Sequence, residues 1–330
     1  MSGTLLEIND LAVSFSTQGG EVQAVRGVSF AVGPGETVAI VGESGCGKSV
    51  TAQSIMRLIP EPPGRIKHGS IHLHGKDLAS LTEKQMRNVR GKQIGMIFQD
   101  PMTSLNPTLT VGDQLTEGIL THEKMSQREA NKEAIELLHL VGIANPDERL
   151  KQYPHQFSGG MRQRLMIAMA LMCKPELLIA DEPTTALDVT IQAQIIDLFK
   201  EIQEKTGVAI IIITHDLGVV AQIADRINVM YAGEIVEYGT VKEIFYQPEH
   251  PYTRGLLTSV PRLDGDRSQP LIPIVGTPPD LFAPPVGCAF TSRCKYAMKV
   301  CQAHDPEVTE LSEQHYTKCW LQDDRVEKPY

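Results

Sequence analysis

The chain has 330 residues, of which 42% are hydrophobic and 22% are charged, the balance of an ordinary globular protein. Its formal net charge of -9 argues against a broad basic surface for duplex DNA or RNA, so no nucleic-acid partner is expected. The N-terminus lacks a signal-peptide pattern, and no apolar run approaches the roughly 20 residues that span a bilayer. We therefore expect a soluble protein that reaches a membrane only through partners.

The predicted elements alternate between strands and helices for most of the chain. Residues 5–30 alternate apolar and polar side chains on either side of Gly19-Gly20, which predicts a β-hairpin. Further strands are expected near residues 37–41, 71–73, 94–98, 177–180 and 209–214. A helix is expected after the glycine-rich loop, up to about residue 58, and helical structure is expected over residues 111–142, 161–172 and 191–202. This order is typical of an α/β protein with a parallel sheet.

Composition changes near residue 247, where prolines accumulate and the alternation of strands and helices ends. We expect a boundary there, with a main domain over residues 1–245 and a small, loop-rich extension over residues 246–330. The sequence contains no internal repeat and no low-complexity segment.

A glycine-rich loop lies between the strand at residues 37–41 and the helix after it. Its sequence, Gly42-Glu43-Ser44-Gly45-Cys46-Gly47-Lys48-Ser49, fits GxxxxGK[ST], a pattern that chance produces in about one per cent of chains of this length. Glycines let successive N–H groups point at phosphate oxygens, Lys48 suits the β- and γ-phosphates, and the Ser49 hydroxyl suits Mg²⁺. Cys46 has the simpler alternative role of a tolerated small side chain. The candidate ATP-binding residues are Gly42, Ser44, Gly45, Cys46, Gly47, Lys48, Ser49 and Val50.

Polar residues also follow two later apolar strands. The strand at residues 177–180 ends in Asp181 and Glu182, which suit Mg²⁺ binding and activation of the attacking water, respectively. The strand at residues 209–214 is followed by His215, whose imidazole is suited to a hydrogen bond with the γ-phosphate. Each signal is weak alone, because strands often end in polar residues at the surface. Together with the phosphate loop, they predict a nucleotide-hydrolysing site.

A second anion-binding helix start lies between these motifs. The segment Phe157-Ser158-Gly159-Gly160-Met161 resembles the LSGGQ signature of ABC ATPases, with Phe in place of Leu and Met in place of Gln. Ser158, Gly159 and Gly160 open a helix there. In the ABC family this segment meets, across a dimer interface, the ATP held by the partner's phosphate loop.

Other landmarks of that family occur in the expected order. Phe15 resembles the aromatic residue that stacks on adenine, although a core strand residue is nearly as good an interpretation. Gln99 resembles the Q-loop glutamine that contacts Mg²⁺ and water, Ala186-Leu187-Asp188 resembles the D-loop, and His215 resembles the switch histidine. The resemblance therefore implies Mg²⁺ binding by Ser49, Gln99 and Asp181, catalysis by Glu182, His215 and Gln99, and contacts in trans from Ser158, Gly159, Gly160 and Asp188.

The resemblance to ABC ATPases covers about residues 4–245. It implies an α/β fold of the P-loop NTPase type, with a RecA-like core, an antiparallel β subdomain and an α-helical subdomain at about residues 103–170. The small cysteine-containing extension follows.

Three further segments resemble the ATPases of oligopeptide, dipeptide and nickel importers. They are Gln99-Asp100-Pro101-Met102-Thr103-Ser104-Leu105-Asn106-Pro107, Tyr153-Pro154-His155-Gln156 and His250-Pro251-Tyr252-Thr253. That family pairs two related ATPase subunits with two membrane-spanning permeases and an external substrate-binding protein. The resemblance implies a peripheral protein on the cytoplasmic face of the cell membrane that drives import of di- or oligopeptides, while nickel, glycosides and other small solutes stay open as cargo.

Four of the six cysteines fall close together near the C-terminus, namely Cys288, Cys294, Cys301 and Cys319. In a cytosolic protein such a group favours a metal over disulfides, although the paired CxxC pattern typical of structural zinc is absent. Four thiolates suit a [4Fe–4S] cluster or Zn²⁺. The peptide-importer ATPases, which this arrangement resembles, carry a [4Fe–4S] cluster, so we expect that cofactor beside ATP and Mg²⁺. Four reduced, buried thiols remain the alternative.

Two other classes of function are weaker fits. Translation ATPases of the ABC type carry two cassettes in a chain, whereas this chain has one phosphate loop. Repair ATPases insert coiled coils between the phosphate loop and the signature, yet here that interval is about 110 residues without sustained heptads. A metal-sensing regulator built on the cysteines lacks a DNA-binding pattern. Transport is the function that the sequence favours.

Overall fold

The computed structural model describes residues 3–185, 187–259 and 273–328. These residues form two compact units whose segments alternate along the chain. Unit 1 consists mainly of the described residues of 78–213 and also includes residues 32–37. Unit 2 contains residues 6–31, 38–77 and the described residues from 214 onward. In the described part of the chain, no helix combines the length and apolar character needed to cross a membrane.

Three parallel strands form the sheet of unit 1. They are β6 (Ile94–Ile97), β7 (Leu177–Asp181) and β8 (Ala209–Thr214), with β7 paired to both neighbours. Every residue of β7 and β8 is buried, as expected for parallel strands covered on both faces. Helix α8 (Val189–Thr206) connects β7 to β8 and buries Ile195, Phe199 and Ile202, which confirms the predicted apolar face.

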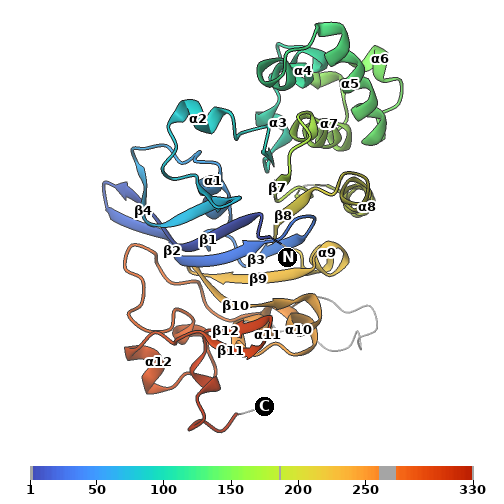
Figure 1. Ribbon diagram of the computed structural model, residues 1–330. Coiled ribbons are helices and arrows are strands. Elements are labelled where there is room, and N and C mark those ends of the chain that lie inside the picture. Colours follow the sequence, from blue (N-terminus) through green and yellow to red (C-terminus); the bar gives the residue numbers. More distant parts are fainter. Residues whose placement is uncertain (1–2, 186, 260–272, 329–330) are drawn as a thin grey trace. The chain divides into compact units, whose positions relative to one another are not determined.

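The remainder of unit 1 is mostly helical (Figure 1). Its helices are α2 (Glu83–Arg87), α3 (Pro101–Ser104), α4 (Val111–His122), α5 (Gln127–Leu140), α6 (Pro146–Arg149) and α7 (Gly159–Leu171), with a 3-10 turn η1 (Pro154–Gln156). The helical structure predicted over residues 111–142 is confirmed, but it is divided into the two helices α4 and α5. The chain becomes extended at Glu123, and Ser126 and Glu129 form a capping box that starts a second helix.

Unit 2 contains an antiparallel sheet near the N-terminus of the chain. Its strands are β1 (Leu6–Thr17), β2 (Gly20–Val32), β4 (Gly64–Leu73) and β5 (Lys76–Asp77), in the order β2-β1-β4-β5. The neighbouring β1 and β2 confirm the predicted hairpin around Gly19-Gly20. Strand β4 is longer than expected from residues 71–73, and it pairs with β1 from Leu6 to Phe15.

A second set of strands in unit 2 carries the phosphate loop. Strand β3 (Thr37–Val41) runs parallel to β9 (Arg226–Tyr231), and β9 pairs antiparallel with β10 (Glu234–Thr240). Helix α1 (Lys48–Ile55) follows β3, α9 (Leu217–Ile223) precedes β9, and α10 (Val241–Tyr246) follows β10. The predicted strand at 37–41 is confirmed, and all five of its residues are buried.

Helices and strands also occur beyond residue 245, in the segment that the sequence predicts to be loop-rich. The added elements are α11 (Pro251–Thr258), α12 (Lys299–Ala303), β11 (Thr309–Ser312), β12 (His315–Thr317) and two 3-10 turns, η2 (Thr291–Arg293) and η3 (Trp320–Gln322). Strand β12 pairs with β10, so this segment extends the sheet that carries the phosphate loop (Figure 1). The strands β11 and β12 could not be predicted from the proline-rich composition, because they are stabilised by strand pairing rather than by local propensity.

Candidate functional site

The phosphate loop has the backbone that its glycines permit. Gly42, Gly45 and Gly47 all have positive φ angles, of 154°, 79° and 103°. A Cβ atom on Gly42 would lie 2.1 Å from the Met230 carbonyl oxygen, and one on Gly47 would lie 2.3 Å from the Ala24 carbonyl oxygen. Side chains are therefore excluded at both positions by backbone packing as well as by φ. The loop leads directly into α1, and the N–H groups at a helix N-terminus are suited to binding an anion.

Lys48 lies inside this loop. Its side chain is buried, and Nζ donates hydrogen bonds to the carbonyl oxygens of Gly42, at 2.9 Å, and Glu43, at 3.0 Å. The ammonium group thus bridges two carbonyl oxygens of the loop, at the place where phosphate oxygens are expected to bind. Ser49 and Val50 follow it in α1, and Ser44 and Gly45 are exposed at the tip. Burial raises the pKa of the Cys46 thiol, which favours a neutral packing role for that side chain.

His215 shares a hollow with the phosphate loop in unit 2. The hollow has a volume of about 330 Å³, and Gly42, Glu43 and His215 are among the residues that line it. Its remaining lining residues are Val41, Leu217, Leu256, Ser259, Pro273 and Ile274. The structure therefore brings the predicted switch histidine beside the loop, and residues beyond 245 complete the wall.

Glu182 and Gln99 meet in unit 1, as their positions after adjacent parallel strands predict. The Gln99 side-chain amide donates a 2.7 Å hydrogen bond to Glu182 Oε2, and the Thr185 hydroxyl donates another to the same oxygen at 3.0 Å. Glu182 has a φ of 47°, a left-handed conformation that is costly for a non-glycine residue and is typical of functional sites. Asp181 ends β7 with its side chain buried, and its carboxylate is of the kind that Mg²⁺ prefers.

The signature residues form the start of α7, also in unit 1. Ser158 is the N-cap, and its hydroxyl accepts a 3.4 Å hydrogen bond from the Met161 N–H. A Cβ atom on Gly159 would meet nothing within 4 Å, so this side of the helix start is open. A Cβ atom on Gly160 would lie 3.0 Å from the Ile191 side chain, so glycine permits the close approach of α8.

The predicted D-loop aspartate caps the neighbouring helix. Asp188 Oδ1 accepts a 3.0 Å hydrogen bond from the Ile191 N–H, and Asp188 is exposed at the start of α8. The signature and Asp188 are therefore linked through Ile191. Ala186, the first residue of the predicted D-loop, lies outside the described residues.

Phe15 lies on β1 in unit 2, opposite Gly64 of β4. A Cβ atom on Gly64 would lie 3.0 Å from Phe15 Cε1, so the ring packs over the glycine. The side chain is half-buried, which leaves part of its surface for another group. Both interpretations of Phe15, a strand residue and a stacking surface for adenine, are compatible with this position.

The four C-terminal cysteines line one narrow cavity in unit 2. Cys288, Cys294, Cys301 and Cys319 share it with His250, Pro251, Phe290, Thr291, Tyr296, Trp320 and Leu321. Burial raises the pKa of Cys294, of Cys288 to about 11 and of Cys319 to about 12. Across the described residues, no group of three or more His, Cys, Asp or Glu side chains is disposed to hold a metal ion. The four cysteines therefore share one cavity, but their side chains are not arranged as a metal-binding group in this structure.

Sequence reasoning missed three residues around the phosphate loop, namely Glu43, Tyr252 and Arg293. The Tyr252 hydroxyl accepts a 2.9 Å hydrogen bond from the Glu43 N–H, and Arg293 forms an ion pair with the Glu43 carboxylate. Tyr252 belongs to the His250-Pro251-Tyr252-Thr253 segment, which the resemblance singled out without a role. Nothing in the sequence around Glu43 or Arg293 signals their pairing.

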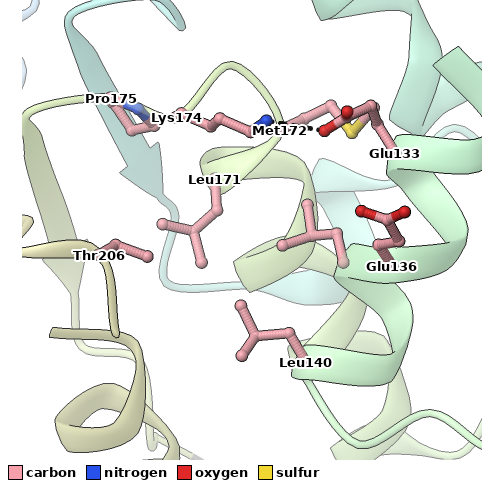
Figure 2. Close-up of a pocket in the computed structure, with 9 residues that line it drawn as sticks. Glu133, Glu136, Leu140, Leu171, Met172, Lys174, Pro175 and Thr206 are labelled. Atoms are coloured by element: carbon pink, nitrogen blue, oxygen red, sulfur yellow. Dashed lines mark hydrogen bonds and ion pairs between the residues drawn. The ribbon is translucent and has the colours of Figure 1, made fainter. Parts of the chain in front are cut away.

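A separate hollow of about 380 Å³ lies in unit 1, among α5, the end of α7 and the end of α8 (Figure 2). Its apolar lining includes Leu137, Leu140, Leu171 and Met172, and two further lining residues, Glu133 and Lys174, form an ion pair of 2.8 Å. None of the motif residues lines it, so it is not part of the nucleotide site.

Comparison with known proteins agrees with the motifs. Residues 25–185 match the ABC transporter family, and residues 236–301 match the oligopeptide/dipeptide transporter C-terminal region. The dipeptide transport ATP-binding protein DppD of Bacillus subtilis (strain 168) is 64% identical over 323 residues, which are 98% of this chain and 96% of that protein. The oligopeptide transport ATP-binding protein OppD of the same strain is 63% identical over 317 residues, or 96% of this chain and 88% of that protein.

Solved structures show the same architecture. The dimeric post-hydrolysis state of the ATP-binding cassette MJ0796, bound to ADP and Pi, is 27% identical and aligns with a TM-score of 0.65 over 72% of this chain and 98% of its own. CbiO1 from Clostridium perfringens, part of the ABC transporter complex cbiONQ, is 29% identical with a TM-score of 0.63 over 74% of this chain and 91% of its own. The predicted fold class is thereby confirmed. The chain belongs to the ATP-binding proteins of the ABC transporter family, in the group that carries the oligopeptide/dipeptide transporter C-terminal region.

Proposed function

We propose that this chain hydrolyses ATP to drive import of di- or oligopeptides, working at the cytoplasmic face of the cell membrane. The observation that carries the proposal is the combination of a complete set of ABC motifs with the oligopeptide/dipeptide C-terminal region in one chain. The names of the similar proteins DppD and OppD support peptides over nickel or other solutes as cargo.

The motif residues take the following roles in this proposal. The phosphate loop binds ATP, with Lys48 at the β- and γ-phosphates and Phe15 against the adenine. Ser49, Gln99 and Asp181 bind Mg²⁺, which neutralises phosphate charge. Glu182 holds the attacking water and accepts its proton, oriented by the hydrogen bond from Gln99. His215 contacts the γ-phosphate, while Ser158, Gly159, Gly160 and Asp188 act on the ATP of a partner subunit.

The proposed assembly contains a second, related ATPase subunit, two membrane-spanning permeases and a substrate-binding protein outside the membrane. The open side of the signature at Gly159 and the exposed Asp188 support a partner ATPase at this edge of unit 1. The Phe98 side chain, which directly precedes Gln99, is 42% exposed, which supports a permease contact beside the Q-loop. We also propose the domain division at residue 245, with the helical subdomain at about residues 103–170.

Purification of the tagged chain from its native membrane in mild detergent tests this assembly. We expect two multi-span membrane proteins and a second ATPase to co-purify, identified by mass spectrometry. The Lys48→Ala variant serves as a matched control for assembly without nucleotide binding. Recovery of ribosomes or nucleic-acid enzymes, with no membrane subunit, would contradict the transport function while leaving the ATPase chemistry intact.

The [4Fe–4S] cluster is also retained as a proposal, with Cys288, Cys294, Cys301 and Cys319 as its ligands. Two observations support the fit. The first is that all four thiols line one cavity. The second is that His250 lines the same cavity and that its buried Nε2 atom has no hydrogen-bond partner among the described residues. His250 Nδ1 accepts from the Tyr252 N–H, so Nε2 carries the proton and is free to donate to a sulfur. The cluster would supply negative sulfur acceptors there and hold the cysteine loops together.

Iron and acid-labile sulfide assays on anaerobically purified protein test this cluster. We expect about four irons and four sulfides per chain, and their loss in the Cys301→Ser variant, because removing one thiolate opens the site. Cys173→Ser is the matched control, since Cys173 lies in unit 1 outside the cavity. Stoichiometric zinc without sulfide would replace the cluster with a structural zinc site, and absence of any metal would leave four reduced thiols.

A further inference from the structure

Glu43 of the phosphate loop is held by two residues from the region beyond residue 245. The Arg293 guanidinium binds its carboxylate through both oxygens, with Nη1 to Oε2 at 2.5 Å and Nη2 to Oε1 at 2.9 Å. The Tyr252 hydroxyl accepts the hydrogen bond of the Glu43 N–H at 2.9 Å. Both the side chain and the backbone of this loop residue are therefore fixed from outside the loop.

The Arg293 side chain is itself buried and has further hydrogen-bond partners. Only 2% of it is exposed, whereas the Glu43 side chain is 29% exposed. Nε donates to the Val275 carbonyl oxygen, and Nη2 also donates to the Ile274 carbonyl oxygen, each at 3.1 Å. A planar guanidinium with this many fixed partners loses little freedom when it forms the ion pair, and lysine has no equivalent geometry.

Aromatic rings complete the surroundings of the guanidinium. The Arg293 Cζ atom lies 5.8 Å from the Tyr231 ring centre and 5.9 Å from the Phe290 ring centre. The Tyr231 and Tyr252 ring centres are 4.5 Å apart, and Phe290 packs against both. These contacts make a rigid support that reaches from the cysteine-containing segment to the phosphate loop.

The position of Glu43 makes this support relevant to nucleotide binding. Its carbonyl oxygen accepts a hydrogen bond from Lys48 Nζ, and Glu43 lines the same hollow as His215. Ile274, which Arg293 holds through its carbonyl oxygen, lines that hollow too. A change at Arg293 would thus alter the loop conformation and one wall of the phosphate site together.

We infer that Arg293 is a positioning residue for ATP binding, which acts through Glu43 to pre-organise the phosphate loop. In this arrangement the region beyond residue 245 is a working part of the nucleotide site. The ion pair fixes the loop before ATP arrives, so less ordering is needed on binding, and ATP affinity rises. Chemistry at Glu182 is not touched by this contact, so the effect falls on KM for ATP more than on kcat.

The test uses the full chain in its membrane assembly and measures KM and kcat for ATP, with the thermal midpoint as a check on folding. For Arg293→Gln we expect KM to rise about tenfold and kcat to change less than about twofold, because ordering of the loop is lost and the chemistry is kept. Glu43→Gln, which keeps the side-chain size, should give the same pattern. The KM of Arg293→Lys should lie between those of the wild type and Arg293→Gln, because lysine keeps the positive charge but cannot form the two parallel hydrogen bonds of a guanidinium.

The double variant Arg293→Gln/Glu43→Gln decides whether the two residues act as one device. Its KM should equal that of Arg293→Gln, because removing Glu43 has no further effect once the ion pair is broken. The matched control is Arg325→Gln, which removes an exposed ion pair with Asp323 from the same region and should leave KM unchanged. Multiplying effects in the double variant, or a lowered thermal midpoint with unchanged KM in Arg293→Gln, would overturn the proposal and leave Arg293 a structural residue.

Discussion

Glu182→Gln is expected to leave ATP binding intact and to lower ATP turnover by at least about 100-fold, the usual contribution of a general base. The amide is nearly the same size as the carboxylate, so β7 and its turn should keep their packing. The amide of glutamine cannot accept a proton from the attacking water, however. The hydrogen bond with Gln99 would therefore orient a group that no longer acts as a base. The geometry of the Gln99–Glu182 contact thus predicts a variant that binds ATP and holds it.

The measurement pairs equilibrium binding of ATP with steady-state hydrolysis in the same preparation. Glu176→Gln is a matched control, because it makes the same change at the exposed start of the segment leading into β7, and its turnover should be normal. Unchanged hydrolysis in Glu182→Gln would remove Glu182 from the role of base. A parallel loss of ATP binding would point instead to collapse of the strained turn at Glu182.

Lys48→Ala is expected to weaken ATP binding itself, by about 100-fold, in the range found when one partner of a buried, hydrogen-bonded charge pair is removed. Lys48 Nζ lies within hydrogen-bonding distance of two loop carbonyl oxygens, at the place where the β- and γ-phosphates are expected. Alanine removes the cation and also the group that holds those carbonyls together. Turnover should fall as a consequence of lost binding.

Lys205→Ala is the control for the general effect of removing a lysine. Lys205 forms an exposed ion pair with Glu201 on α8, and such pairs contribute little, so ATP affinity should not change. Titration of each variant with a fluorescent ATP analogue gives the affinities directly. Normal affinity in Lys48→Ala would refute the assignment of residues 42–49 as the phosphate loop.

Both of these predictions rest on motifs that are short in sequence. The phosphate loop is recognisable because its constraints are local, namely positive φ angles at glycines, a preceding buried strand and a following helix. For the same reason the strands at residues 37–41, 177–180 and 209–214 were predicted correctly, since buried parallel strands are short apolar runs. The break at residues 123–126 was also encoded locally, in the Ser126 and Glu129 capping box, but the long polar helix pattern concealed it.

The contacts that join the motifs were decided by the tertiary structure. The hydrogen bond between Gln99 and Glu182 joins residues 83 positions apart, and it exists because parallel pairing brings the ends of β6 and β7 to one edge. Strands β11 and β12 have weak local signals and are stabilised by pairing with β10. The ion pair between Arg293 and Glu43 spans 250 positions, and it depends on the packing of three aromatic rings that no sequence pattern specifies. Local rules determine which residues can bind a phosphate, whereas the folding of distant segments onto one another decides what holds those residues in place.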